Sequence, residues 1–570
     1  MQFKELSSYF QKLEQTSSRL AITEILGELF RHASEQEIGK LIYLLQGRVA
    51  PLYEATEFGM ADKFMIRAIA LAYGKEIDDV TMAFKKAGDV GKAAEALHNT
   101  KAEQATVLSV FSKLLEIAET NGTGSQEKKI ALMADLLKKN DALSTRYLAR
   151  IPLDKLRLGF SDVTILDGLS WMLTGDKSNR EALEAAYDVR PDIGYIAEQV
   201  KREGMKGLSH IRAHIGSPVL AQLSQRLPTA DDMIKKMHDV AVEPKYDGVR
   251  IQIHFKRGSF ARSFSRNLES TTDMFPELSF LGDELKGDEV ILDGEAVGIN
   301  PKTGAIISFQ ETTTRKRKHN VNEASQSVPV KFFVFDILYK DGKDLLGLPL
   351  SERRVVLEKT VKNGKYLSIS PQIITSSADE IRSYHDEQLK KGLEGAMVKK
   401  WNSPYEPGRR GYSWVKFKEE EGKEGKLTDT IDAVIMGYYL GEGKRTSFGI
   451  GALLVGVKSG DHFVTVTKIG TGVSDELWQT LQKKLHALEV REQPKEYVDV
   501  NKIFRPDVWV SPTIVVELAG DDLTKSPTHG AGYAVRFPRL VRIRTDKHPD
   551  QITSTREIAH MFSMQGTHKA

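Results

Sequence analysis

The chain has 570 residues, which at about 150 residues per domain predicts roughly four domains, or three of which one is oversized. Its hydrophobic content of 40% is ordinary for globular proteins, and a net charge of only +3 requires no polyanionic partner for the chain as a whole. The absence of cysteine excludes disulfides, thiol nucleophiles and cysteine-built zinc or iron–sulfur sites.

The first residues, MQFKELSSYFQKLEQ, are charged and helical in pattern, unlike a signal peptide with its basic and then apolar segments. No stretch of the chain approaches about 18 uninterrupted apolar residues. We therefore expect a cytoplasmic protein without membrane contact.

Helix-period runs fill residues 1–222. Examples are the runs at 19–32 and 130–140, and turns such as ETNGTGSQE and VRPDIG separate them. This pattern predicts an all-α domain over 1–222.

Short β-rich runs dominate from about Pro244 onward. They occupy 249–255, 290–299 and 330–339, and a helical run at 351–361 accompanies them. We predict an α+β domain over 223–427. The segment KEEEGKEGKLTD (418–429) has too little apolar content to pack, so we interpret it as a linker between two rigid bodies.

Alternating apolar and polar residues return in the last part of the chain. Four such runs lie at 432–440, 451–457, 462–470 and 513–519, with one helical segment at 474–489. We expect a small β-barrel over 428–570.

A candidate nucleophile, Lys245, lies in the segment EPKYDGVRIQIHF, at the head of a turn before a strand. The pattern K-x-D-G alone is weak, because about 0.2 chance occurrences are expected in a chain of this length. Five further runs follow it in order, namely SRNLES (265–270), LDGEAVG (292–298), FFVFDIL (332–338), LEGAMVKK (393–400) and SWVKFK (413–418).

Each run suits one task in nucleotidyl transfer. Glu295 and Glu394 are candidate oxygen ligands for Mg²⁺, and the ring of Phe335 could stack on a base. The candidate cations for phosphate groups are Arg250, Arg266, Lys416 and Lys418. Any one of these residues alone has an ordinary structural explanation, but the ordered set favours a nucleotide-binding site.

This ordered set resembles the covalent nucleotidyltransferases, and the whole chain resembles three-domain ATP-dependent DNA ligases of the archaeal and eukaryotic replicative type. The runs GKRTSFGIGALLVGV, TKIGTGVSDE and RFPRLVRIRTDKHPDQITS are similar to the oligonucleotide-binding-fold (OB-fold) domain of that family. GTGSQEKK and KLRLGFSD are similar to loops with which the family's DNA-binding domain grips the minor groove. The resemblance implies a helical DNA-binding domain (1–222), an adenylation domain (223–427) and an OB-fold barrel (428–570).

The resemblance also implies roles for single residues. Lys245 would become lysyl-AMP, Glu243 would lie at the adenine, and Glu394 would bind metal. The other nucleotide-contacting positions would be Arg250, Arg266, Glu295 (on the ribose or metal), Phe335, Arg410, Lys416 and Lys418. Arg544 and Lys547 would swing over ATP during self-adenylation, and Lys155, Arg157 and Gly159 would contact DNA.

The implied reaction has three steps. A lysine near its ordinary pKa of about 10.4 is almost wholly charged at pH 7, so Mg²⁺ and nearby arginines must favour its neutral form. Lys245 then attacks ATP, the AMP passes to a 5′-phosphate, and a 3′-hydroxyl displaces AMP to seal the nick. We expect ATP and Mg²⁺ as cofactors and nicked duplex DNA as the partner, in replication, repair and recombination.

Four alternatives share parts of this pattern. An RNA ligase or an mRNA-capping guanylyltransferase would use the same lysine chemistry, but neither needs a 220-residue helical region to encircle duplex DNA. A NAD-dependent ligase is disfavoured because this chain cannot build that family's cysteine zinc finger. A non-catalytic DNA-binding scaffold is disfavoured by the intact set of Lys245, Glu295, Glu394 and Lys416.

Two further features leave partner predictions open. The basic run TRKRKH (314–319) fits either a nucleic-acid patch or a solvated loop. Many archaeal relatives carry a glutamine-plus-aromatic sliding-clamp motif, but here Gln104 is followed by a single aromatic, Phe111, inside an amphipathic helix. We find no clear clamp motif, and we expect a monomer.

Overall fold

The structure is a computed structural model that describes residues 1–156, 158–300, 303, 305–307, 328–417, 430–441 and 449–564. Four predicted features therefore lie outside the described residues: Arg157, Lys418, the 314–319 run and the 418–429 linker. The chain forms two compact units, Met1–Lys418 and Glu419–Ala570, and each is described by itself.

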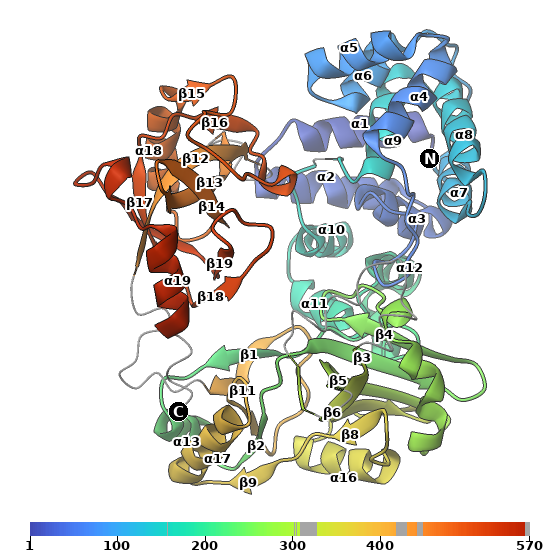
Figure 1. Cartoon of the computed structure of the whole chain (residues 1–570). Coiled ribbons are helices and arrows are strands. Elements are labelled where there is room, and N and C mark those ends of the chain that lie inside the picture. Colours follow the sequence, from blue (N-terminus) through green and yellow to red (C-terminus); the bar gives the residue numbers. More distant parts are fainter. Residues whose placement is uncertain are drawn as a thin grey trace. The chain divides into compact units, whose positions relative to one another are not determined.

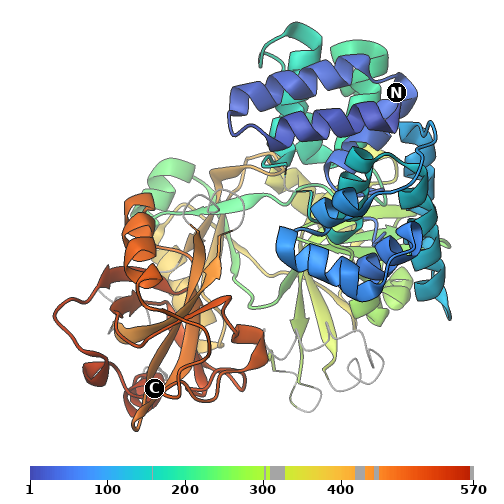
Figure 2. The ribbon, with the colours of Figure 1, turned by 90° about the horizontal axis from the view of Figure 1, so that it is seen from above.

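Helices α1 to α12 form the first half of the larger unit. They are α1 (Phe3–Glu14), α2 (Arg19–His32), α3 (Glu35–Leu45), α4 (Asp62–Tyr73), α5 (Ile77–Ala87), α6 (Val90–Leu97), α7 (Val107–Glu119), α8 (Ser125–Lys139), α9 (Ala142–Arg150), α10 (Asp162–Thr174), α11 (Arg180–Val189) and α12 (Ile193–Glu203). The helices α1 and α2 lie side by side (Figure 2), and α2 packs on α10, so that one continuous apolar core runs through this region.

Capping side chains and charged residues fix where several of these helices begin. The hydroxyl of Thr106 accepts a hydrogen bond from Ser109 N at the start of α7, and Asp89 accepts one from Lys92 N at the start of α6. The α2 bounds match the predicted run at 19–32. By contrast, α8 begins at Ser125 rather than at Ile130, because its polar first turn carries Glu127, which favours a helix N-terminus without contributing to the apolar period.

The second half of the larger unit is built on two sheets (Figure 1). Its strands are β1 (Leu223–Arg226), β2 (Val240–Pro244), β3 (Val249–Lys256), β4 (Phe260–Ser265), β5 (Glu289–Gly298), β6 (Val330–Lys340), β7 (Lys343–Asp344), β8 (Leu367–Ile369), β9 (Ile373–Thr375), β10 (Ala396–Lys400) and β11 (Arg410–Phe417). The helices are α13 (Ala230–Met237), α16 (Leu350–Thr360) and α17 (Ala378–Lys390).

The order of the strands shows where the chain crosses from one sheet to the other. One sheet runs β1-β11-β10-β2-β9, and the other runs β4-β3-β5-β6-β7, with β8 paired to β6. Each sheet has an apolar core of its own, and a third cluster that includes Phe335 of β6 and Trp414 of β11 joins the two sheets. The chain passes from the first sheet to the second between β2 and β3, which is the loop that holds Lys245.

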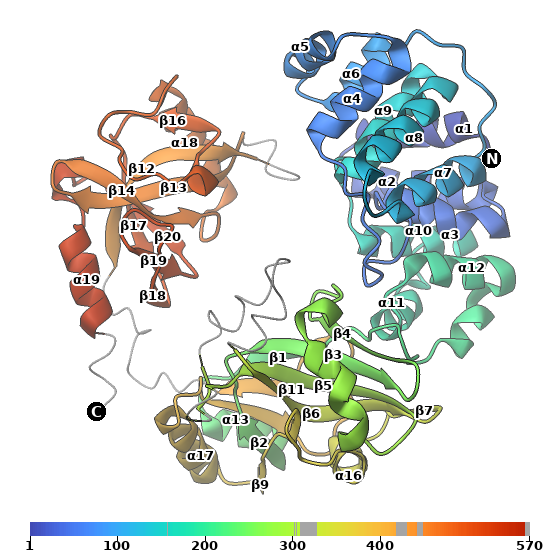
Figure 3. The ribbon, with the colours of Figure 1, turned by 45° about the vertical axis from the view of Figure 1, so that its right-hand side comes forward.

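The C-terminal unit is rich in strands. They are β12 (Ile431–Leu440), β13 (Ile450–Ser459), β14 (His462–Ile469), β15 (Glu489–Val490), β16 (Val508–Val510), β17 (Val515–Ala519), β18 (Asp522–Lys525), β19 (Tyr533–Arg536) and β20 (Arg539–Ile543), with helices α18 (Asp475–His486) and α19 (Thr555–Met564). The main sheet runs β14-β13-β12-β16-β15, β17 pairs with both β12 and β20, and α19 packs beside β18 (Figure 3). These pairings do not establish a closed barrel, which stays a prediction.

Among the described residues, no helix combines the length and the apolar character that crossing a bilayer requires.

Candidate active site

The backbone around Lys245 is fixed by the turn that precedes β10. Lys245 N donates to the carbonyl of Gly395 at 2.9 Å, and Glu394 N donates to the carbonyl of Lys245 at 3.1 Å. Gly395 adopts a φ of 116°, and a Cβ at this position would lie only 2.7 Å from Nε2 of His385, so the turn requires glycine. The side chains of Lys245 and Glu394 form an ion pair, so the structure brings together the predicted nucleophile and a predicted metal ligand.

The neighbouring strands β3 and β5 carry a second set of charged side chains. Arg250 lies opposite Glu295 in the strand register and donates to both carboxylate oxygens of Asp293, at 3.2 and 2.7 Å. Burial raises the pKa of Glu295 to about 8, although the positive charges of Arg250 and Lys245 oppose this shift. A Cβ at Gly248 would lie 2.5 Å from the carbonyl oxygen of Ala296, which explains the glycine of the K-x-D-G turn.

The acidic residues fit Mg²⁺ only as partial ligands. No group of three or more His, Asp or Glu side chains within the described part of the chain could hold a metal ion by itself. Mg²⁺ commonly keeps several waters and binds one or two carboxylates together with substrate phosphates. Glu295 and Glu394 fit that role, in which the ion would neutralise phosphate charge.

A buried cluster of charged and aromatic side chains, here called the buried wall, begins two residues before Lys245 in the chain. Glu243 and Lys399 form an ion pair of 2.7 Å, and each side chain is only 2% exposed. The ammonium of Lys399 lies 4.2 Å from the ring centroid of Phe335 and 4.3 Å from that of Trp414. These two rings also pack edge to face against each other, with centroids 5.7 Å apart.

Two buried polar atoms of this wall fit a nucleotide base. Glu243 Oε1 and Trp414 Nε1 have no hydrogen-bond partner within the described residues. Buried polar atoms are normally satisfied, because leaving one unpaired costs about 1–3 kcal/mol. A purine with an exocyclic amino group and ring nitrogens offers partners for both atoms. Burial raises the pKa of Glu243, and the charge of Lys399 opposes that rise.

The remaining predicted cations are Arg266, Arg410, Lys416 and Lys418. Desolvation, together with the positive charges of Arg250 and Arg410, lowers the pKa of Arg266. Arg266 and Arg410 are exposed, and Lys416 of β11 lies opposite Met397 of β10. Lys418 lies outside the described residues.

Sequence reasoning missed two features of the site. Lys399 is the first of the two lysines that close the LEGAMVKK run, and its position two residues after Met397 on one strand face was the available signal. The hydroxyl of Tyr405 donates to Asp293 at 2.7 Å and so helps to fix Arg250, but nothing in the local sequence marks this tyrosine.

Arg544 and Lys547 lie in the C-terminal unit. Both side chains donate to the carboxylate of Asp432, at 2.9 and 2.5 Å respectively.

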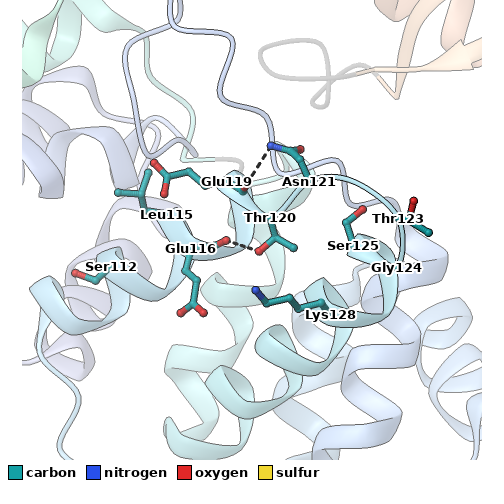
Figure 4. Close-up of a pocket in the computed structure, with 10 residues that line it drawn as sticks. All are labelled: Ser112, Leu115, Glu116, Glu119, Thr120, Asn121, Thr123, Gly124, Ser125 and Lys128. Atoms are coloured by element: carbon teal, nitrogen blue, oxygen red, sulfur yellow. Dashed lines mark hydrogen bonds between the residues drawn. The ribbon is translucent and has the colours of Figure 1, made fainter.

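The predicted DNA loops lie in the helical region. Lys155 forms an ion pair of 2.8 Å with Asp62, and both side chains are about 40% exposed. Gly159 has a φ of 76°, and a Cβ there would meet open space. The GTGSQEKK loop borders a hollow of about 510 Å³ between α7 and α8 (Figure 4). Because Glu116 and Glu119 line its α7 side, phosphate contacts would have to use the opposite rim, which includes Lys128.

Family models and full-length relatives identify this arrangement. Three models match in order: "DNA ligase N terminus" over residues 2–170, "ATP dependent DNA ligase domain" over 218–418 and "ATP dependent DNA ligase C terminal region" over 446–547. A probable DNA ligase of Dictyoglomus thermophilum is 41% identical over all of this chain and 99% of that protein. The chain belongs to the ATP-dependent DNA ligase family.

Archaeal members of the family are also similar over their full length. DNA ligase 2 of Thermofilum pendens is 37% identical over 99% of this chain and 97% of its own length. The DNA ligase of Saccharolobus solfataricus is 36% identical over 99% of this chain and 98% of its own length. The chain is therefore an ATP-dependent DNA ligase enzyme, and the prediction of its family and activity is confirmed.

A solved structure named "Pmar-Lig_PreS3" supports the fold alone. It covers 95% of this chain and 99% of its own, with a TM-score of 0.55 and 16% identity. The predicted fold class, in which a helical region precedes an α+β nucleotidyltransferase domain and a β-rich region, is confirmed.

Proposed function

We propose that Lys245 is the nucleophile with which this ligase takes AMP from ATP. Its amine, once deprotonated, attacks the α-phosphorus, forms the N–P bond of lysyl-AMP and displaces pyrophosphate. A 5′-phosphate at the nick then takes the AMP and releases Lys245, and the 3′-hydroxyl displaces AMP to form the phosphodiester. Bound Mg²⁺, held in part by Glu295 and Glu394, would supply charge neutralisation on the phosphates.

The loop that carries Lys245 is the observation on which this proposal rests. It begins two residues after Glu243 of the buried wall and leads directly to Arg250 on the neighbouring sheet. Glu243 Oε1 would accept a hydrogen bond from the adenine amino group, with Phe335 stacked on the base. The phosphates would be neutralised by Arg250, Arg266, Arg410 and Lys416, with Lys418 outside the described residues. Arg544 and Lys547 of the C-terminal unit would contact ATP during the first step.

We propose nicked duplex DNA as the partner, held in part by Lys155, Arg157 and Gly159 of the helical region. The same proposal includes a division into domains at 1–222, 223–427 and 428–570, a monomeric state and a cytoplasmic location.

Phe111 is the single aromatic residue in the segment compared above with the sliding-clamp motif. Its side chain is 7% exposed and lies within the helical core, which supports a packing role for it.

The test uses ATP, GTP and NAD, each labelled so that the transferred nucleotide carries the label. We expect label on the chain from ATP alone, and transfer to a nicked DNA duplex followed by sealing when the labelled protein is chased with that duplex. Labelling by GTP would support a guanylyltransferase, and sealing of nicked RNA but not of nicked DNA would support an RNA ligase. No labelling by any nucleotide would contradict the proposal.

A further inference from the structure

The side chain of Asp432 in β12 is a carboxylate that has no role in the reaction described above. It is 8% exposed, and its two oxygens accept hydrogen bonds from two different cations, Oδ1 from Arg544 and Oδ2 from Lys547. The side chains of Arg544 and Lys547 are 13% and 32% exposed. One acid therefore holds both cations that the proposed function places over ATP.

The position of Asp432 is fixed by its backbone. Its amide donates to Thr553 Oγ1 at 3.0 Å, and its carbonyl accepts from Thr553 N at 3.1 Å. On its other edge, β12 pairs with β17, where Asp432 lies opposite Glu517. The carboxylate thus projects from an anchored strand, whereas Lys547 lies beyond the end of β20 on a long, flexible side chain.

The neighbouring acids have other roles. Asp546 binds the opposite edge of Arg544, at 2.9 and 2.7 Å, but its side chain is 63% exposed. Glu517 accepts from Arg542 at 2.6 Å and from Thr430 at 2.8 Å, and it lies 3.7 Å from Arg544. Among the described contacts, Asp432 is the acid that joins Arg544 to Lys547.

We propose that Asp432 is a positioning residue for self-adenylation, which holds Arg544 and Lys547 at a fixed spacing suited to the pyrophosphate end of ATP. When two cations are held in place before ATP binds, their side chains lose less conformational entropy on binding, and this favours the bound complex. The proposal rests on the proposed function, in which Arg544 and Lys547 contact ATP in the first step. The second and third steps involve no pyrophosphate, so they do not depend on this spacing.

The test measures two reactions of the full-length protein. Single-turnover labelling with α-labelled ATP gives the rate and the half-saturating ATP concentration, and sealing of a pre-adenylated nick gives the last step alone. Asp432→Asn keeps the size of the side chain and the backbone contacts to Thr553. We expect it to raise the half-saturating ATP concentration about tenfold, because a hydrogen bond to a charged group contributes about that factor. Asp432→Glu should recover part of the loss.

Sealing of the pre-adenylated nick should stay within about twofold of wild type. The matched control is Asp461→Asn, an exposed aspartate between β13 and β14, which should leave both reactions unchanged. Wild-type ATP dependence in Asp432→Asn would overturn the proposal. Faster labelling would also overturn it, because Asp432 would then be a competitor of ATP for the two cations.

A double-mutant cycle separates the two proposals and also separates positioning from folding. If the proposed function holds, Arg544→Ala with Lys547→Ala slows labelling, and adding Asp432→Asn to that pair causes little further loss. Wild-type labelling in the Arg544→Ala, Lys547→Ala variant would refute the role of these cations itself. Additive losses in the triple variant, or equal losses in both reactions, would mean that Asp432 only stabilises the fold, and the positioning role would be refuted.

Discussion

The Glu243–Lys399 pair places two opposite charges where water does not reach. Breaking a buried ion pair by removing one partner costs about 3–5 kcal/mol, whereas replacing both partners can be nearly neutral. The pair is therefore expected to contribute more to the geometry of the buried wall than to net stability.

A prediction follows for Lys399→Met. It should lower the free energy of unfolding by about 3 kcal/mol or more, since Glu243 would be left as an uncompensated buried acid. The double variant Glu243→Gln, Lys399→Met should recover most of that loss. Urea unfolding checks the stabilities, and labelling with ATP should stay weak in both variants. An equal loss of stability in the double variant would contradict this account.

At the scale of residues, the sequence singled out Lys245 and Glu394 because both belong to short runs whose order carries the signal, and the structure pairs their side chains. It missed Lys399 because the partner that explains a buried lysine, Glu243, lies 156 positions earlier. The bidentate contact of Arg250 with Asp293 was hidden for a similar reason, since it depends on how β3 and β5 are paired.

At the scale of elements, β3 ties the preceding chain to the six-stranded sheet through His254. Its Nδ1 accepts a hydrogen bond from Gly216 N at 3.0 Å, so Nε2 carries the proton and donates to Gln252 at 2.9 Å. Burial, with the positive charges of His214 and Arg262, lowers the pKa of His254 to about 3. Gln252 in turn exchanges hydrogen bonds with the backbone of Val219.

This link predicts an acid-sensitive fold. Because the pKa of His254 is lower in the folded chain, its contribution to stability is present above pH 6.5 and is lost as the pH falls toward 3. The loss between pH 6.5 and 5 should be about 2 kcal/mol. His254→Asn should be less stable at pH 7 but should show a flatter dependence over that range, measured by urea unfolding. An unchanged slope would mean that His254 does not titrate as described.

The loop at 155–162 yields a prediction that separates DNA binding from chemistry. Lys155→Ala with Arg157→Ala should leave lysyl-AMP formation at the wild-type rate, because ATP does not meet this region in the proposed reaction. Nick binding should weaken, and the slope of log affinity against log salt should become shallower by about one to two units. Unchanged nick affinity would refute the DNA-binding role of this loop, and weaker binding with an unchanged slope would point to contacts other than phosphates.

The sequence predicted most elements but not all of their ends. Apolar periodicity located α2, and alternation located β3, because each has one face in a core. The start of α8 was missed since a polar first turn lacks that periodicity. Strand partners, such as the parallel pairing of β1 with β11, depend on contacts between residues far apart in the chain and have no local signal.

At the scale of the whole molecule, the chain divides into two compact units, and the cations Arg544 and Lys547 lie in the unit that does not contain Lys245. A chain that ends at Lys426 should therefore self-adenylate poorly. It should still seal a pre-adenylated nick to some extent, because that step involves no pyrophosphate. Labelling with ATP and sealing of the pre-adenylated nick measure the two steps separately. Wild-type labelling by the truncated chain would show that the C-terminal unit has no role in the first step.

The central claim is that Lys245 carries AMP between ATP and the nick. The most direct test is to label wild type, Lys245→Ala and Lys245→Arg with α-labelled ATP and to identify the labelled peptide by mass spectrometry. We predict AMP on the wild-type peptide that contains Lys245 and none on either variant, because arginine keeps the positive charge but cannot act as the nucleophile. Covalent AMP on either variant, or on another wild-type peptide, would contradict the account.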